Sequence, residues 1–186
     1  MKITKTSLDG VAVIEPQVFG DQRGWFMETY HLGRLQEYGF NINFIQDNHS
    51  FSAAKGTLRG LHYQTNPKAQ SKLVRCTRGA IFDVAVDIRK GSPTFAQWVG
   101  IELTAVNKKQ LLIPKGFAHG FVTLTDDVEV QYKVDEYYAP ECDRSINWND
   151  PDINITWPLV SNPILSAKDI AAPLLKNADN NFKYGD

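Results

Sequence analysis

The amino-acid sequence predicts a mainly β protein, an antiparallel jelly roll with a few short helices, the main one C-terminal. Two observations predict this class. Short segments alternate between apolar and polar residues with a period of two, and turn residues separate them about every 8–12 positions. Many short strands with regular turns favour a sandwich or barrel over a βαβ fold. A jelly roll also leaves a cavity between two curved sheets, which inward side chains can line.

The predicted strands follow one another along the chain. The alternation is clearest over residues 80–89, where one face is apolar and the other carries Asp83, Asp87 and Arg89. We expect the apolar face to pack in a core and the polar face to lie in solvent or line a site. Further strands are predicted over residues 11–14, 24–30, 43–46, 58–64, 98–103, 111–113, 117–125 and 128–134, with a turn at 126–127.

Helical signals are few. Residues 31–38 are expected to form two turns that end at Gly39, and a stronger helical signal begins near Ser166. The second helix includes Ile170, Leu174 and Leu175 in its apolar pattern, although Pro173 limits it.

Length and composition indicate a single domain over residues 1–186 with a short tail at 177–186. The 20 Lys and Arg residues nearly balance the 21 Asp and Glu residues, so the chain lacks the basic excess of a general nucleic-acid binder. The two cysteines, Cys76 and Cys142, form neither a disulfide framework nor a CxxC zinc motif. The sequence contains no signal peptide and no apolar stretch of membrane-spanning length, which predicts a cytoplasmic protein that does not bind membranes.

The segment Leu58–Gln64 is the first candidate for chemistry. On a strand, Gly60 and His62 share a face, and the small Gly60 leaves room for a ligand or another backbone to approach. Imidazole titrates near neutral pH and suits general-base catalysis. A structural histidine bonded within the core is the alternative. The period of two places Arg59 on the opposite face unless the strand bends or bulges.

Two more side chains are expected to point inward. Tyr132 keeps phase with a valine row on its strand, so it is either a core tyrosine or an acid in the cavity. Lys72 keeps phase with Val74 and Cys76. A buried ammonium is costly, so Lys72 either reaches out from the strand end or faces an anion or a developing oxyanion.

Asp169 lies in a Ser-x-x-Asp pattern that begins at Ser166, a near match to a helix capping box. The same carboxylate could orient a histidine if the helix starts at the mouth of the cavity. The four histidines, His31, His49, His62 and His119, show no HxH or HxxxH spacing. The sequence therefore predicts no metal site, and it carries no phosphate-binding glycine motif either.

Six motifs together resemble a known family. They are residues 19–26 (FGDQRGWF), 46–50 (QDNHS), 58–64 (LRGLHYQ), 82–89 (FDVAVDIR), 113–121 (IPKGFAHGF) and 165–169 (LSAKD). In this order they resemble the dTDP-4-dehydrorhamnose 3,5-epimerases, from about Val11 to Asp169. The resemblance implies a cupin-type jelly roll, a reaction without cofactor or metal, and a homodimer that exchanges N-terminal strands. The tail after Lys176 is not covered.

The resemblance also implies roles. His62 matches the catalytic base, Asp169 its paired carboxylate, Tyr132 the acid on the opposite face, and Lys72 the cation beside the C4 carbonyl oxygen. The residues that match binding of the dTDP-sugar, some of them supplied by the partner subunit, are Arg23, Glu28, Gln46, Asp47, Asn48, Arg59, His119, Asp143 and Lys168. We also expect Tyr138 to form part of an aromatic wall for the thymine.

Three alternatives remain at this stage. A relative that inverts only C5, or a sugar ketoisomerase, would share much of the pocket and differ in its product. A non-catalytic sugar-binding jelly roll would need the pocket but not the set of His62, Lys72 and Tyr132. A metal-dependent oxygenase is disfavoured by the spacing of the histidines.

Overall fold

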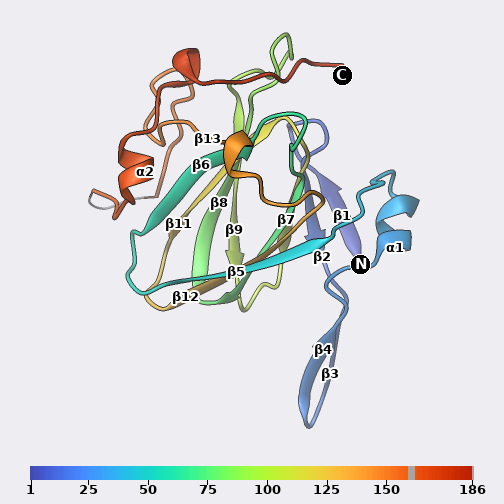
Figure 1. The fold of residues 1–186 in the computed structure, drawn as a ribbon. Coiled ribbons are helices and arrows are strands. Elements are labelled where there is room, and N and C mark those ends of the chain that lie inside the picture. The colour runs from blue at the N-terminus through green and yellow to red at the C-terminus, as the bar shows by residue number, and fades with distance from the viewer. Residues whose placement is uncertain (159–161, 186) are drawn as a thin grey trace.

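The computed structural model describes residues 1–158 and 162–185, and its body consists of two antiparallel sheets that face each other (Figure 1). The first sheet has the order β1 (Lys2–Lys5), β2 (Ala12–Glu15), β10 (Gln110–Ile113), β7 (Lys72–Arg78), β12 (Val128–Val134) and β5 (Gln46–Ser52). The second has the order β13 (Asp143–Ser145), β6 (Leu58–Gln64), β11 (Phe117–Thr123), β8 (Ala80–Asp87) and β9 (Trp98–Thr104). The predicted mainly β jelly roll is confirmed.

The main core lies between the two sheets. Its buried side chains alternate along each strand, for example Val74 and Cys76 on β7 and Ile81 and Ala85 on β8. The strand β9 also contacts β7 and β10 of the opposite sheet, which closes one side of the sandwich. The edge strands β5 and β13 lie at the other end of their sheets, so the sandwich opens there.

The C-terminal part of the chain covers the outer face of the five-stranded sheet (Figure 1). Ile146, Ile153, Leu175 and Phe182 pack there against apolar residues of β6, β8 and β11. Both faces of β8 are therefore buried. The predicted polar face does not lie in solvent: Asp83 is 0% exposed and contacts His119 at the cleft, which agrees with the alternative that this face lines a site.

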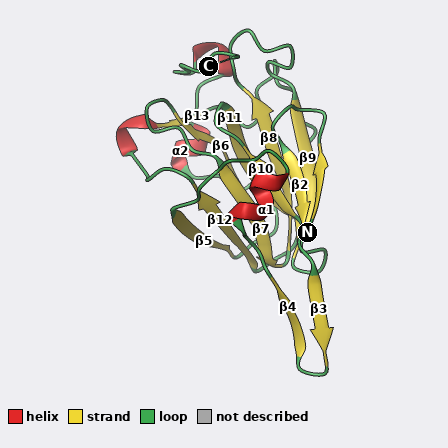
Figure 2. Ribbon diagram, turned by 90° about the vertical axis from the view of Figure 1, so that its right-hand side faces the viewer, coloured by secondary structure: helices red, strands yellow, loops and turns green. Residues whose placement is uncertain are grey.

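A two-stranded hairpin extends away from the body, formed by β3 (Val18–Asp21) and β4 (Gly24–Met27) (Figures 1 and 2). Three aromatic side chains on it are widely exposed: Phe19 at 60%, Trp25 at 59% and Phe26 at 68%. Monomeric proteins rarely expose contiguous apolar patches of this kind. This chain alone leaves the hairpin unpartnered among its described residues.

The helices are short. They are α1 (Leu32–Glu37), η1 (Pro140–Cys142), α2 (Ala167–Ile170) and η2 (Leu175–Asn177). The predicted first helix is confirmed as α1. The expectation that the main helix is C-terminal was wrong: α2 has 4 residues against 6 in α1. The cause is Pro173, which disfavours helical backbone at the residue before it and ends the helix early.

Most strand predictions agree with the structure, and those over 58–64 and 128–134 match β6 and β12 to the residue. The strand predicted over 43–46 was wrong, since β5 begins only at Gln46. The strand predicted over 24–30 ends earlier, at Met27. No helix within residues 1–158 and 162–185 has the length and apolar character required to cross a membrane.

Candidate active site

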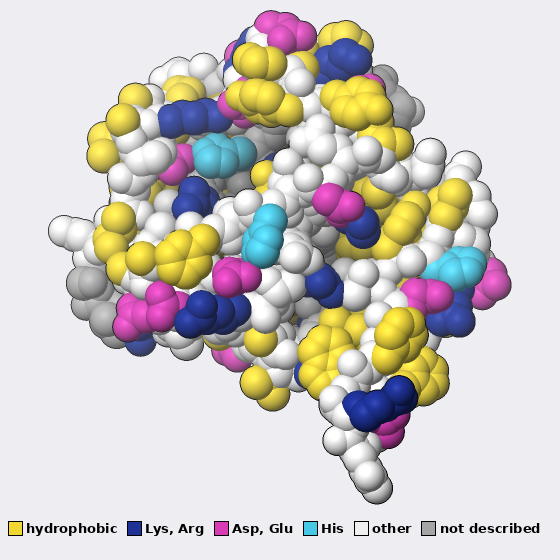
Figure 3. All heavy atoms as spheres, turned by 60° about the horizontal axis from the view of Figure 1, so that its bottom comes forward, with side chains coloured by type: hydrophobic (Ala, Val, Ile, Leu, Met, Phe, Trp, Pro, Cys, Tyr) yellow, Lys and Arg dark blue, Asp and Glu magenta, His cyan; other side chains and the backbone are white. Residues whose placement is uncertain are grey.

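A polar cleft opens between the two sheets and consists of two adjoining cavities. The inner cavity has a volume of about 370 Å³ and the outer one about 210 Å³. His62, Lys72 and Tyr132 line both cavities and so lie where the two meet. In the space-filling view, histidine and charged side chains gather round a hollow on this face (Figure 3).

His62 and Asp169 form a close pair at this junction. His62 Nε2 lies 2.6 Å from Asp169 Oδ1, and the histidine side chain is 31% exposed whereas the aspartate is 2% exposed. Burial raises the pKa of Asp169, but hydrogen bonds from His62, Ser166 and the Gly60 backbone outweigh it and hold this pKa below its usual range. Because a carboxylate only accepts, Nε2 is the ring nitrogen that donates in this pair.

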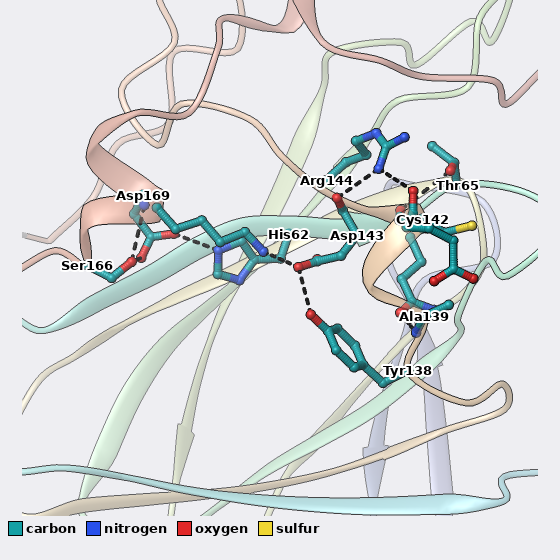
Figure 4. A network of polar contacts seen from close by, with 12 residues as sticks. His62, Thr65, Tyr138, Ala139, Cys142, Asp143, Arg144, Ser166 and Asp169 are labelled. Atoms are coloured by element: carbon teal, nitrogen blue, oxygen red, sulfur yellow. Dashed lines mark hydrogen bonds and ion pairs between the residues drawn. The ribbon is translucent and has the colours of Figure 1, made fainter.

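The helix α2 delivers the carboxylate. Ser166 caps this helix by accepting from the Asp169 backbone N–H at 3.2 Å, as the sequence pattern predicts. The Ser166 hydroxyl also donates to Asp169 Oδ2 at 2.7 Å (Figure 4). Asp169 thus serves the capping turn and the histidine at once, and the two interpretations of the sequence do not exclude each other.

Tyr132 faces His62 from the opposite sheet. The histidine is on β6 of the five-stranded sheet, whereas the tyrosine is on β12 of the six-stranded sheet. Tyr132 packs against the main core and lines both cavities, so it points inward as predicted. Burial raises the pKa of its phenol, which keeps it protonated and able to donate a proton at neutral pH.

Lys72 shares the inner face with Tyr132. Val74 of β7 pairs with Tyr132, and Lys72 lies two residues before Val74 on the same strand, so both point to the same side. Its Nζ donates to the His62 carbonyl oxygen at 3.4 Å, across the space between the sheets. Burial lowers the pKa of Lys72 to about 8, and the nearby Asp143 and Asp83 oppose this. The ammonium therefore lies inside the cleft and does not extend away to solvent.

A second histidine–carboxylate pair lies beside the first. His119 on β11 pairs with His62 across the antiparallel ladder, and its Nε2 lies 2.7 Å from Asp83 Oδ1. Burial lowers the pKa of His119, even though the charge of Asp83 and its hydrogen bond to His119 act to raise this pKa. The sequence analysis places Asp83 on the polar face of its strand but does not assign it to the site.

Two glycines let β6 and β11 approach closely. A Cβ on Gly60 would lie 2.5 Å from the Gly120 Cα, and Gly60 has a φ of +135° that side chains rarely adopt. The register of the two strands shifts at this point, between His119 and Phe121. Arg59 therefore lines the same cavity as His62, which agrees with the exception expected for a strand that bends or bulges.

Arg59 also links the sheets at the mouth of the cleft. Its Nε donates to Ser52 Oγ at 3.2 Å and its Nη2 to the Phe51 carbonyl at 3.0 Å, both on β5. The guanidinium is thereby held at the edge of the inner cavity.

Other predicted binding residues line the outer cavity. Asp143 accepts from Tyr138 Oη at 3.3 Å and from Lys168 Nζ, and Figure 4 shows the first of these contacts beside His62. Gln46 and Asn48 reach the same cavity from β5, where the Gln46 amide donates to Asn48 Oδ1 at 3.0 Å. The structure thus gathers these five residues as expected.

Three predicted residues lie elsewhere. Arg23 is on the projecting hairpin, where it pairs with Asp21. Glu28 pairs with Arg34 at 3.0 Å near α1. Asp47 points to the outer side of β5 and pairs with Lys133 at 2.7 Å. None of these three lines the two cavities of this chain.

Over residues 1–158 and 162–185, no group of three or more histidine, cysteine, aspartate or glutamate side chains is placed to hold a metal ion. The cleft instead holds imidazole groups paired with carboxylates, together with an ammonium group and a phenol. This set can abstract a proton, donate one and stabilise an oxyanion.

Comparison with known proteins agrees with this geometry. A family model described as dTDP-4-dehydrorhamnose 3,5-epimerase matches residues 5–177. The protein of that name from Salmonella typhimurium is 56% identical over 179 residues, which cover 96% of this chain and 97% of that one. A more distant relative from Streptomyces niveus, 36% identical over 96% of this chain and 86% of its own, is named dTDP-4-dehydrorhamnose 3-epimerase.

Solved structures agree as well. The dTDP-6-deoxy-D-glucose-3,5-epimerase of Legionella pneumophila, in complex with dTDP-4-keto-L-rhamnose, superposes with a TM-score of 0.92. It is 49% identical, and the match covers 96% of this chain and 94% of that one. The jelly roll and its cleft thus define an epimerase of the nucleotide-sugar class. The chain belongs to the dTDP-4-dehydrorhamnose 3,5-epimerase family.

Proposed function

We propose that this protein inverts C3 and C5 of dTDP-4-dehydro-6-deoxy-D-glucose and so forms dTDP-4-dehydro-L-rhamnose. One observation carries the proposal: His62, paired with Asp169 of α2, and the Tyr132 phenol come from opposite sheets and line one cleft, with the Lys72 ammonium between the sheets. Both carbons flank the C4 ketone, so loss of either proton gives an enolate that these groups can stabilise.

The first step is proton removal. His62 Nδ1 takes the proton from C3 or C5 while Nε2–H stays bonded to Asp169. The carboxylate fixes this tautomer and stabilises the imidazolium that forms. The C–H electron pair moves into the ring, and the C4 oxygen gains negative charge opposite the Lys72 ammonium.

The second step is reprotonation from the other face. Tyr132 donates its phenolic proton to the same carbon, so the configuration inverts. His62 then holds one extra proton and Tyr132 lacks one, and both return to their starting states by exchange with solvent. The same cycle at the second carbon completes the reaction, and no net oxidation or reduction occurs.

The outer cavity is proposed to bind the nucleotide end of the substrate. Tyr138 offers an aromatic face for thymine, and its hydroxyl is held by Asp143. Arg59, which lines the inner cavity, supplies a charged, planar group suited to the diphosphate. Gln46, Asn48, His119 and Lys168 add donors and acceptors along the cleft.

We further propose that the active enzyme is a homodimer in which the hairpin β3–β4 reaches the partner's cleft. The hairpin exposes Phe19, Trp25 and Phe26, and it carries Arg23 away from the cleft of its own chain. A second copy would cover these aromatic side chains and would bring Arg23 and Glu28 to a substrate.

The reaction is tested by NMR of dTDP-4-keto-6-deoxyglucose incubated with the protein in D₂O. We expect deuterium at C3 and C5 and a product with both centres inverted. Inversion at a single centre would instead indicate a monoepimerase, and migration of the ketone a ketoisomerase. Binding without any exchange would indicate a sugar-binding module and would contradict the proposal.

The dimer is tested by mixing two variants. If Arg23 acts in the partner's cleft, Arg23→Ala and His62→Asn subunits form mixed dimers with one intact site, so activity returns on mixing. If Arg23 acts in its own chain, both sites of a mixed dimer are defective and mixing restores nothing. Sedimentation analysis of each variant checks that the dimer itself persists.

A further inference from the structure

The last residues of the chain form a strap, here defined as residues 178–184, that lies against the five-stranded sheet. The family model ends at residue 177, so the strap lies beyond the matched region. Even so, Asn180 and Phe182 are buried, at 7% and 5% exposure. A segment that only trailed into solvent would not bury such side chains.

Three kinds of contact hold the strap in place. Phe182 packs in the outer apolar cluster, where its ring lies 6.3 Å from that of Tyr63. The Lys90 N–H donates to the Phe182 carbonyl at 3.1 Å, and the Tyr184 N–H donates to the Lys90 carbonyl at 3.0 Å. The Asn180 side chain also donates to the Ile88 carbonyl.

Asp179 joins the strap to two strands at once. Its carbonyl accepts from Tyr63 Oη at 2.7 Å, and its carboxylate accepts from Arg144 Nε at 2.7 Å. Tyr63 on β6 and Arg144 on β13 are paired across the ladder. Asp179 therefore clamps β13 to β6 from the outer face.

The residues on either side of this pair belong to the cleft. Asp143 pairs with Gln64 on the ladder, and both line the outer cavity, as does His62. Successive residues of a strand point to opposite faces, so the clamp on Arg144 fixes the strand from which Asp143 points inward.

The clamp matters because β13 has a paired strand on one side only. It is a three-residue edge strand whose one neighbour in the sheet is β6. Arg144 also donates through Nη1 to the Glu141 carbonyl at 2.8 Å and the Asp143 carbonyl at 3.0 Å. Figure 4 shows this guanidinium bound to backbone oxygens while the Asp143 side chain reaches Tyr138. One guanidinium thus connects the strap to the turn that carries Asp143.

We propose that Asp179 is a positioning residue for substrate binding: through Arg144 it sets the place of Asp143, and with it Tyr138 and Lys168. The inference rests on the proposed function of the cleft. It predicts an effect on binding and not on chemistry, because His62 and Tyr132 lie on strands paired on both sides.

The test is steady-state kinetics of Asp179→Ala with the 4-keto sugar nucleotide. We expect KM to rise about three- to fivefold, as for loss of one exposed ion pair, with kcat within twofold of the wild type. Asp179→Asn keeps an oxygen that accepts from Arg144 and should restore a KM close to that of the wild type. Lys183→Ala, at an exposed position of the same strap, is the matched control and should change neither constant.

Two further measurements complete the test. Arg144→Ala should raise KM at least as much, and adding Asp179→Ala to it should cause no further rise, because both act through one contact. An unchanged KM in Asp179→Ala, or an equal rise in Lys183→Ala, would overturn the proposal, even if thermal stability fell. If the wild type fails to turn over the sugar, the proposed function fails. The positioning role of Asp179 is then tested by calorimetry with dTDP. Weaker binding of dTDP to Asp179→Ala than to the wild type supports this role, and equal binding overturns it.

Discussion

His62 and His119 lie directly opposite each other on neighbouring antiparallel strands, and each binds a different buried carboxylate through Nε2. Their surroundings differ. The His62 side chain is 31% exposed to the cleft, whereas that of His119 is 9% exposed. A substrate can therefore reach His62, while burial lowers the pKa of His119 and favours its neutral form. This difference supports the proposed role of His62 as the base, with His119 as a polar wall of the cleft.

Replacing His62 by Asn should remove the base. We expect kcat to fall by about 10²–10⁴-fold, and wash-in of solvent deuterium at C3 and C5 to fall equally. His49→Asn is a suitable control because His49 points outward from β5 and pairs with Glu129. Exchange at the normal rate in His62→Asn would show that another group removes the protons.

Replacing Tyr132 by Phe should separate exchange from inversion. The phenyl ring keeps the packing against the core but cannot donate a proton. His62 can still remove a proton and return it to the same face, so deuterium should enter the substrate while the inverted product is lost. Tyr30→Phe serves as a control for loss of a half-buried hydroxyl outside the two cavities, because the Tyr30 hydroxyl donates to the Ile42 carbonyl. Loss of exchange together with inversion would contradict this division of roles.

The pKa of about 8 at Lys72 predicts a loss of activity in alkaline solution. Below this pH the ammonium faces the C4 oxygen, and above it the neutral amine stabilises the enolate less. We expect kcat/KM to fall as pH rises through about 8. A profile that stays flat to pH 10 would contradict the role of Lys72.

The same shift predicts a stability effect. Between about pH 8 and the usual lysine pKa, the unfolded chain binds a proton that the folded chain does not, so stability rises with pH in that window. Below about pH 8 the buried Lys72 ammonium is charged in the folded protein and lowers its free energy of unfolding by the full amount. Lys72→Met should therefore be inactive yet more stable at pH 7 by about 1–3 kcal/mol, as measured by urea unfolding.

Replacing Gly60 by Ala should disrupt the crossing of β6 and β11. The added Cβ meets the Gly120 backbone, and the positive φ adds strain, so we expect a loss of roughly 3 kcal/mol or more. Gly56 has a φ of +81°, and a Cβ added there would have no atom within 4 Å. Gly56→Ala therefore isolates the backbone strain and should cost about 1–2 kcal/mol of stability. Equal thermal shifts in the two variants would mean that the close approach is not what requires glycine at residue 60.

The strands with an apolar row could be predicted from the sequence. Val128, Val130 and Val134 on β12 define a buried face, and Tyr132 follows the same phase into the cleft. The strand β5 could not be placed in this way. Apart from Phe51, its residues are polar on both faces, because one side lines the cleft and the other faces outward, so no apolar period marks where it starts.

The arrangement of the site depended on features that local spacing does not contain. The strand period alone separated Arg59 from His62, and the register shift beside Gly120 brings them together. The sequence pattern at Ser166 predicted the cap of α2 but not its distance from β6. That Asp169 reaches His62 follows from how the C-terminal layer packs on the sheet.

The proposed base and its carboxylate come from different parts of the architecture, since His62 belongs to the sandwich and Asp169 to the layer wrapped around it. During synthesis, all strands of both sheets have been made before the helix that carries the aspartate leaves the ribosome. A nascent chain can therefore complete its scaffold while the histidine still lacks its partner. Competence for proton transfer would then arise late, at the docking of a single helical turn.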